Sequence, residues 1–136
     1  QPPVLAQAVE RVGEIIGDFG TVGGGGAGIE VDRFSTELGS PPHALVVATS
    51  EGLSDTYYPG PEDIDGAHSA MDATLNSNVR ADMTFFETPC GGAVFSVGSI
   101  AYIGSLSWNE FDNNVARLTG NVLRRFLDDE LFDFPV

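Results

Sequence analysis

The distribution of apolar residues in this 136-residue chain predicts an α/β fold. A short continuous apolar run over 43–50 is typical of a strand that is buried on both faces, as in a parallel sheet. Two further apolar stretches, 82–88 and 92–100, meet at the turn sequence Pro-Cys-Gly-Gly and predict a hairpin. Apolar residues at helical spacing over 115–127 predict a helix near the carboxyl end.

These elements are few for an independent α/β domain. Little of the chain remains to cover the strand at 43–50, and a doubly wound sheet usually needs more strands. The chain also begins with Gln1 rather than Met, as a segment or a processed subunit would. We therefore expect 1–136 to be a single domain or fragment, the C-terminal part of a larger α/β domain.

The segment before the glycine-rich stretch predicts a helix. Pro2 and Pro3 suit a helix entrance. Gly13 and Gly17 disfavour helix and predict an early end. The apolar positions at helical spacing are Val4, Leu5, Ala8, Val9, Val12, Ile15, Ile16 and Phe19.

An exposed loop is expected between the first strand and the hairpin. Residues 51–66 contain the sequence Tyr-Pro-Gly-Pro among many acidic residues, a composition typical of loops. Residues 67–80 show no decisive period, and a short helix is one interpretation of them.

The C-terminal helix has two candidate caps. Ser107 and Glu110 have the spacing of a capping box, and Asp112 is the alternative cap. Arg124 and Arg125 lie near the expected end of the helix, where positive charge complements the helix dipole.

The charge composition restricts the class of partner. The chain has 20 acidic residues against 6 basic ones, all of them arginine, and a formal net charge of -14. Such a charge repels phosphates and anionic membranes, so we expect neither nucleic acid nor a membrane as a partner. The sequence shows no long apolar run and no signal-peptide pattern, and we expect a cytoplasmic protein. Cys90 is the single cysteine, which excludes an internal disulfide.

The glycine-rich stretch over 20–28 has the spacing of a dinucleotide-binding loop. Gly23, Gly25 and Gly28 fit G-x-G-x-x-G. Such a fingerprint must follow a strand and open a helix, and neither flank of this stretch has that character. We therefore expect a tight loop whose bare backbone approaches another element or lines a pocket.

Common catalytic motifs are absent from the sequence. His43 and His68 do not form the H-x-H or H-E-x-x-H patterns of metal sites. No G-x-S-x-G is present to mark a nucleophilic serine.

The ends of the predicted strands carry better candidates. Ligands of open α/β sheets bind at the carboxyl ends of strands. Glu51 follows the first strand, and Glu87 ends the second, beside Phe85 and Phe86. Either glutamate is a candidate general base or orienting carboxylate; the alternative for each is a surface or loop-capping acid. Four other aromatic residues suit either packing or a pocket wall: Tyr57, Tyr58, Tyr102 and Trp108.

Two long blocks of sequence are distinctive. They read TFFETPCGGAVFSVGSIAYIGSL over 84–106 and DNNVARLTGNVLRRF over 112–126. Together with shorter blocks they resemble the C-terminal region of the large (beta) subunit of N,N-dimethylformamidase, over about residues 13–127 of this chain. The shorter blocks are GDFG at 17–20 with the glycine loop after it, IEVDR at 29–33 and PPHALVVATSEGLSD at 41–55.

The resemblance implies a function and its partners. It implies an amidohydrolase that cleaves N-substituted formamides to formate and an amine. Its fold would be similar to class I glutamine amidotransferases, a flavodoxin-like sheet to which this segment adds a terminal hairpin and a C-terminal helix. The implied cofactor is a mononuclear iron, with ligands upstream of this segment. The implied partners are the rest of the large subunit, a small subunit, further copies of the assembly and a small amide substrate.

The resemblance also assigns roles to a few residues. A family glutamate near the metal corresponds to Glu51, as the catalytic base. A pocket phenylalanine corresponds to Phe85 or Phe86, and Glu87 adjoins it in the substrate pocket. Three residues are not assigned as metal ligands, because the ligands are expected upstream: Tyr57, Tyr58 and Glu30.

Two features leave the function open. Cys90, Tyr102 and Ile103 lie where we expect variation within the family, so the substrate need not be N,N-dimethylformamide itself. The segment, moreover, either lends Glu51 to the active site or is a non-catalytic module that completes the sheet and the subunit interface. A sugar- or nucleotide-binding module is a third alternative.

Overall fold

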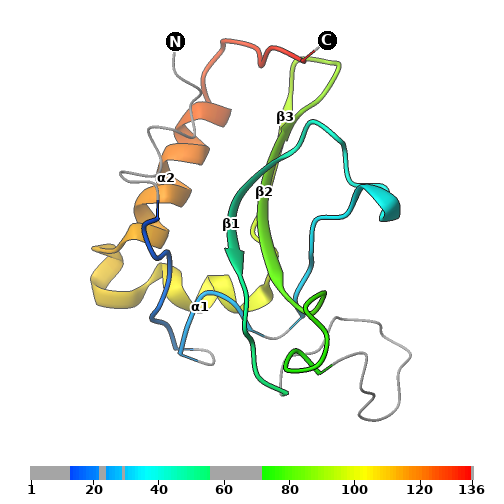
Figure 1. The fold of residues 1–136 in the computed structure, drawn as a ribbon. Helices are drawn as coiled ribbons and strands as arrows, with labels where there is room; N and C mark the ends of the chain where they lie inside the picture. Colours follow the sequence, from blue (N-terminus) through cyan, green and yellow to red (C-terminus); the bar gives the residue numbers. More distant parts are fainter. Residues whose placement is uncertain (1–12, 22–23, 29, 56–71, 136) are drawn as a thin grey trace.

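The computed structural model describes residues 13–21, 24–28, 30–55 and 72–135, and it has an α/β architecture (Figure 1). A small antiparallel sheet in the order β1-β2-β3 packs on the C-terminal helix α2. The elements in chain order are η2 (Thr36–Leu38), β1 (Leu45–Ser50), β2 (Ala81–Glu87), β3 (Ala93–Ser96), η4 (Ile100–Tyr102), α1 (Ile103–Leu106), η5 (Trp108–Phe111) and α2 (Asn114–Phe126).

The predicted hairpin is confirmed in β2 and β3. Glu87 pairs with Ala93 next to the turn, and the ladder continues to the pair of Thr84 and Ser96. The Thr88 N–H donates to the Gly92 carbonyl at 2.8 Å, which closes the turn. Turn chemistry and apolar alternation are local properties, so the sequence predicted this element well.

The prediction of a parallel, fully buried strand over 43–50 is wrong. β1 runs antiparallel to β2, with Leu45 opposite Phe85 and Ser50 opposite Ala81. β1 is an edge of the described sheet, and the side chain of Leu45 is 47% exposed. The apolar run does form a strand, but none of the described elements pairs with its outer side.

Neither predicted cap starts the C-terminal helix. Asn113 is the N-cap of α2, and its side-chain oxygen accepts the Ala116 N–H at 2.8 Å. Asn109, Glu110 and Phe111 all have positive φ angles, of 50°, 55° and 69°. This left-handed stretch is incompatible with helix, so α2 begins after the residues expected to cap it. The last turn does contain both predicted arginines, Arg124 and Arg125.

The main hydrophobic core lies between one face of the sheet and α2. Met83 of β2 contacts the buried stripe of α2, which consists of Val115, Leu118 and Val122. Tyr102 completes this buried cluster. The apolar stripe predicted for the helix therefore faces the sheet, as its spacing requires.

The predicted N-terminal helix is not formed over 13–19, and residues 1–12 lie outside the described part. Gly13 and Gly17 have φ angles of +88° and +68°, which helices do not accommodate. Asn114 instead holds this segment, because its amide donates to the Ile15 carbonyl at 2.8 Å and to Glu14 Oε1 at 3.1 Å.

The structure tests only part of the predictions for residues 51–80, because residues 56–71 lie outside the described part. Residues 72–80 form turns without a helix, with Asp72 accepting the Thr74 N–H at 2.8 Å. Most of the predicted loop over 51–66 lies outside the described residues. Within the part of the chain that the structure describes, no helix has the length and apolarity to cross a membrane.

Candidate functional site

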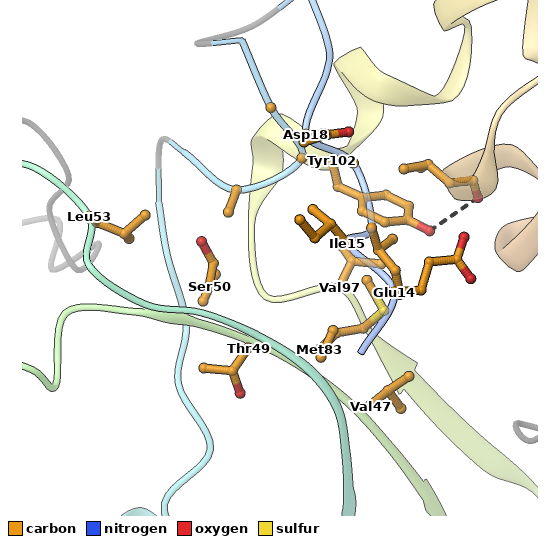
Figure 2. Close-up of a pocket in the computed structure, with 18 of the residues that line it drawn as sticks. Glu14, Ile15, Asp18, Val47, Thr49, Ser50, Leu53, Met83, Val97 and Tyr102 are labelled. Carbon is orange, nitrogen blue, oxygen red and sulfur yellow. Dashed lines mark hydrogen bonds between the residues drawn. The ribbon is translucent and has the colours of Figure 1, made fainter. Parts of the chain in front are cut away.

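A pocket of about 600 Å³ lies between the glycine loop, the inner face of β1 and Tyr102 (Figure 2). Val47 and Met83 supply apolar wall from the two strands, and Leu53 adds to it beyond the end of β1. The opposite wall is backbone of 24–27. A cavity of this size with a largely apolar lining is typical of sites for small organic molecules.

The glycine loop lines this pocket because its backbone packs closely on its neighbours. The Gly26 N–H donates to the Gly17 carbonyl at 2.7 Å, and the Gly28 N–H donates to Ser99 Oγ at 2.9 Å. A Cβ atom on Gly20 would lie 2.6 Å from Ser105 Oγ. These contacts confirm the expectation of bare backbone against another element and in a pocket wall.

The dinucleotide fingerprint has no matching context among the described residues. Gly23 lies outside them, the preceding segment 13–19 is not a strand, and the following Val31 forms an isolated bridge to Ser99 rather than a helix. The described glycines therefore serve close packing.

Two polar side chains on the pocket wall are already engaged. The Tyr102 hydroxyl lies 2.8 Å from Thr119 Oγ1, and burial raises the pKa of this phenol. Glu14 forms an ion pair of 3.4 Å with Arg117 and accepts from Asn114. The pocket thus presents an un-ionised phenol and apolar side chains, together with the exposed carboxylate of Asp18 and the hydroxyls of Thr49 and Ser50.

Glu51 does not itself line this pocket. It follows β1 directly and is exposed, and its neighbours Ser50 and Leu53 both line the cavity. Glu87 lies at the other end of the sheet, because the antiparallel pairing puts Ser50 opposite Ala81. The structure therefore separates the two glutamates that a parallel sheet would have brought to one edge.

The two phenylalanines face opposite sides of β2, as successive strand residues must. Phe85 is buried on the α2 side, where its ring centroid lies 5.7 Å from that of Phe132. Phe86 lines a second cavity, of about 240 Å³, on the other face. The Glu87 carbonyl lies 3.0 Å from the His43 ring. The predicted site residues therefore do not converge on one described cavity: Glu51, Phe85, Phe86 and Glu87. Their catalytic and substrate-pocket roles stay predictions.

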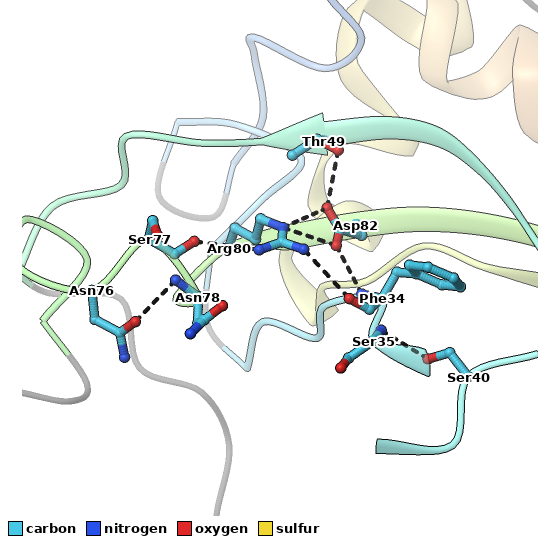
Figure 3. Close-up of polar contacts among 9 residues, drawn as sticks. All are labelled: Phe34, Ser35, Ser40, Thr49, Asn76, Ser77, Asn78, Arg80 and Asp82. Atoms are coloured by element: carbon cyan, nitrogen blue, oxygen red, sulfur yellow. Dashed lines mark hydrogen bonds and ion pairs between the residues drawn. The ribbon is translucent and has the colours of Figure 1, made fainter. Parts of the chain in front are cut away.

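Sequence reasoning missed a buried carboxylate, Asp82 (Figure 3). Arg80 Nε lies 3.1 and 3.0 Å from its two oxygens. Thr49 Oγ1 donates to it at 3.0 Å and the Phe34 N–H at 2.8 Å. With every oxygen engaged, Asp82 holds β1, β2 and the 32–34 segment together rather than acting as a base. The alternation Arg-Ala-Asp on a strand was the available signal, since it puts both charges on one face.

The described residues do not form a metal site by themselves. No group of three His, Cys, Asp or Glu side chains among them is arranged to hold a metal ion. The described residues alone therefore do not fit the iron that the resemblance implies.

Comparison with known proteins gives a consistent result. Residues 5–116 match the family described as N,N-dimethylformamidase beta subunit-like, C-terminal. The chain is 49% identical over 117 residues to the N,N-dimethylformamidase beta subunit of Paracoccus aminophilus, and 47% identical over 117 residues to that of Alcaligenes sp.. Each match covers 86% of this chain but 15% of the relative's length.

The match extends from before the glycine loop into α2, so it includes the pocket, Glu51 and the whole sheet. The resemblance first noted in the sequence blocks is thereby confirmed. The chain belongs to the N,N-dimethylformamidase beta subunit-like, C-terminal family.

Proposed function

We propose that this chain is the C-terminal part of the large subunit of an amidohydrolase. The enzyme hydrolyses N-substituted formamides, such as N,N-dimethylformamide, to formate and an amine. The observation that carries the proposal is the 49% and 47% identity, over 86% of the chain, to two proteins named N,N-dimethylformamidase beta subunit. The rest of the large subunit, a small subunit and further copies are its proposed partners, which native mass spectrometry of the purified complex tests.

The proposed parent fold is a larger sheet similar to class I glutamine amidotransferases. The support is β1, whose residues Leu45 and Val46 are 47% and 45% exposed on the edge of the described sheet. An exposed apolar edge strand promotes aggregation unless another segment covers it. Hydrogen exchange of the full-length protein tests whether another segment covers β1. If β1 is covered, all its backbone amides should exchange slowly; if its edge is free, every second amide should exchange fast.

Glu51 is the proposed base. It is exposed and follows Ser50, a residue of the pocket lining, and no described residue forms a hydrogen bond or ion pair with its side chain, so its carboxylate is free to accept a proton from water. The same group then returns the proton to the leaving amine. N-alkyl groups make no hydrogen bonds, and the apolar wall formed by Val47, Leu53 and Met83 suits them. The proposed iron, with ligands upstream, is tested by metal analysis of the full-length protein.

Substitution of Glu51 tests the catalytic role. In the full-length protein with its partners, Glu51→Gln is expected to lower formate release by about 100-fold or more, the usual scale for a general base. Iron content and assembly should remain as in the parent. Glu37→Gln is the matched control, because Glu37 is an exposed glutamate in η2, away from the pocket.

A non-catalytic role is the second candidate. The exposure of the β1 edge and the wide separation of Glu51 from Glu87 favour a module that completes the sheet and the subunit interface. Unchanged formate release by Glu51→Gln with iron still bound would establish this alternative and exclude Glu51 as the base. Loss of activity together with loss of assembly would also argue for the structural role.

A further inference from the structure

We propose that the second cavity, of about 240 Å³ on the sheet face away from α2, binds a small monocarboxylate through Arg33, Thr84 and Ser96. This cavity lies on the Phe86 side of β2, whereas the 600 Å³ pocket lies on the Met83 side. The proposal goes beyond the amidohydrolase function and does not rest on it.

The backbone on both sides of Arg33 is fixed to the sheet. The Asp32 N–H donates to the Gly98 carbonyl at 2.9 Å, and the Asp82 N–H donates to the Asp32 carbonyl at 2.8 Å. On the other side, the Phe34 N–H donates to Asp82 Oδ2 at 2.8 Å. Arg33 is thus held over the sheet face by contacts that do not involve its own side chain. Such support from surrounding residues is what a preorganised binding group needs.

The guanidinium of Arg33 has no hydrogen-bond or ion-pair partner among the described residues. Each of the other four described arginines does have partners. Arg80 pairs with Asp82, Arg117 with Glu14, Arg124 with Asn121, and Arg125 with two carbonyls and the Phe132 ring. In a chain of net charge -14, carboxylates are abundant, so an arginine left unpaired beside a cavity is available for a ligand.

Two hydroxyl groups face the same cavity. Thr84 and Ser96 are direct partners across β2 and β3, so their side chains project from the same face of the sheet. Neither hydroxyl forms a hydrogen bond with any described residue. Both line the cavity with Arg33, which gives three free donor groups around one space.

The rest of the lining determines the class of ligand. One wall of the cavity is apolar and suits a short hydrocarbon group. It consists of Phe34, Pro41, Ala44 and Phe86. Asp82 also lines the cavity, but its oxygens are engaged by Arg80, Thr49 and Phe34. Asp32 is exposed, where solvent and salt screen its charge.

A planar carboxylate matches these groups. A guanidinium binds a carboxylate through two parallel hydrogen bonds, and the hydroxyls add donors to its oxygens. One positive group balances one negative charge, so a monocarboxylate is favoured over a phosphate or a dicarboxylate in this acidic protein. The ligand class is thus a short-chain monocarboxylate, from formate to propionate.

The test is direct binding to the full-length protein. Line broadening of 13C-labelled formate and propionate is measured against protein concentration, at constant ionic strength set with chloride. Arg33→Gln is expected to weaken binding by at least about tenfold, the scale of one charge-assisted pair. Arg124→Gln removes the same charge from an exposed helix position and should bind as the parent does.

Further variants keep the test decisive. Arg33→Lys retains the charge without the planar fork and should bind with intermediate affinity, even if Arg33→Gln does not fold. Thr84→Val should also weaken binding. The proposal would be overturned if Arg33→Gln bound the carboxylates as tightly as the unsubstituted protein does. It would also be overturned if the unsubstituted protein broadened the carboxylate lines no more than it does in excess chloride. The Arg33 variants are scored by carboxylate binding and the Glu51 variant by formate release, so failure of either proposal is seen separately.

Discussion

Gly98 packs so closely on Asp82 that a Cβ atom at position 98 would lie 2.5 Å from the Asp82 carbonyl oxygen. Gly98 also has a φ angle of +67°, which side-chain-bearing residues rarely adopt. Its own carbonyl accepts the Asp32 N–H at 2.9 Å. One glycine thus joins β2 to the segment that carries Arg33, and this junction leaves no room for a methyl group.

Gly98→Ala is therefore expected to destabilise the sheet strongly. Gly52 is a matched control, since it has the same φ of +67° with nothing within 4 Å of a Cβ. Gly52→Ala measures the conformational strain alone, about 1 kcal/mol. Gly98→Ala should cost about 2 kcal/mol more, because the clash is with backbone. Hydrogen exchange of β2 amides in the full-length protein measures both opening free energies, and equal effects would contradict the close contact.

Asp82→Asn should be among the most destabilising single changes in the described residues. The Asp82 side chain is 2% exposed, and the substitution leaves the Arg80 guanidinium beside a neutral amide. Breaking a buried ion pair on one side costs about 3 kcal/mol or more. Asp133→Asn, at an exposed residue of the C-terminal tail, should stay within about 0.5 kcal/mol. Hydrogen exchange of β1 and β2 amides distinguishes the two, and a mild effect at Asp82 would refute its anchoring role.

Asn113→Ala should shorten or loosen α2. The Asn113 side chain accepts the Ala116 N–H at 2.8 Å and donates to the Leu106 and Trp108 carbonyls. Loss of an N-cap costs about 1 kcal/mol. Ser107→Ala is the control, because Ser107 makes no side-chain cap hydrogen bond here. If Ser107→Ala opened the first turn of α2 more than Asn113→Ala does, the observed cap would be wrong.

The buried phenol of Tyr102 should make the folded protein less stable at alkaline pH. Burial raises the pKa of its phenol above the usual value, so the folded protein holds this proton more tightly than the unfolded chain does. The stabilisation is complete below the unfolded pKa, near 10, and is lost as pH rises through the folded pKa. The difference in urea midpoint between the parent and Tyr102→Phe should therefore shrink from pH 9 to pH 11. A constant difference would show that Tyr102 does not titrate in this way.

Several elements could be predicted because their causes are local. The β2–β3 turn depends on Gly91, which has a φ of +79°, and on its neighbours in sequence. The apolar stripe of α2, which includes Val115 and Leu118, has the helical period that its packing requires. Close packing of the glycine loop could be predicted because its flanks have neither the strand before it nor the helix after it that a dinucleotide-binding loop needs.

Other features depend on partners far along the chain. β1 was assigned to a parallel sheet because its apolar run does not specify the direction of its neighbour. That error placed Glu51 and Glu87 at one edge, whereas the antiparallel register separates them. The anchoring role of Asp82 was equally hidden, since Thr49 is 33 residues away and Phe34 is 48 residues away.

The glycine loop has a consequence for biosynthesis. The segment that leads into it is anchored by residues late in the chain: Ser105 Oγ donates to the Phe19 carbonyl across 86 residues, and Asn114 accepts the Gly17 N–H across 97. Contacts of such high order form slowly and only after their last member has been synthesised. The pocket wall therefore cannot assemble until Ser105 and Asn114 have left the ribosome. Until α2 is released, the apolar residues on one face of β2 lack the helix that covers them, which makes the translation of α2 the step that commits this region to its fold.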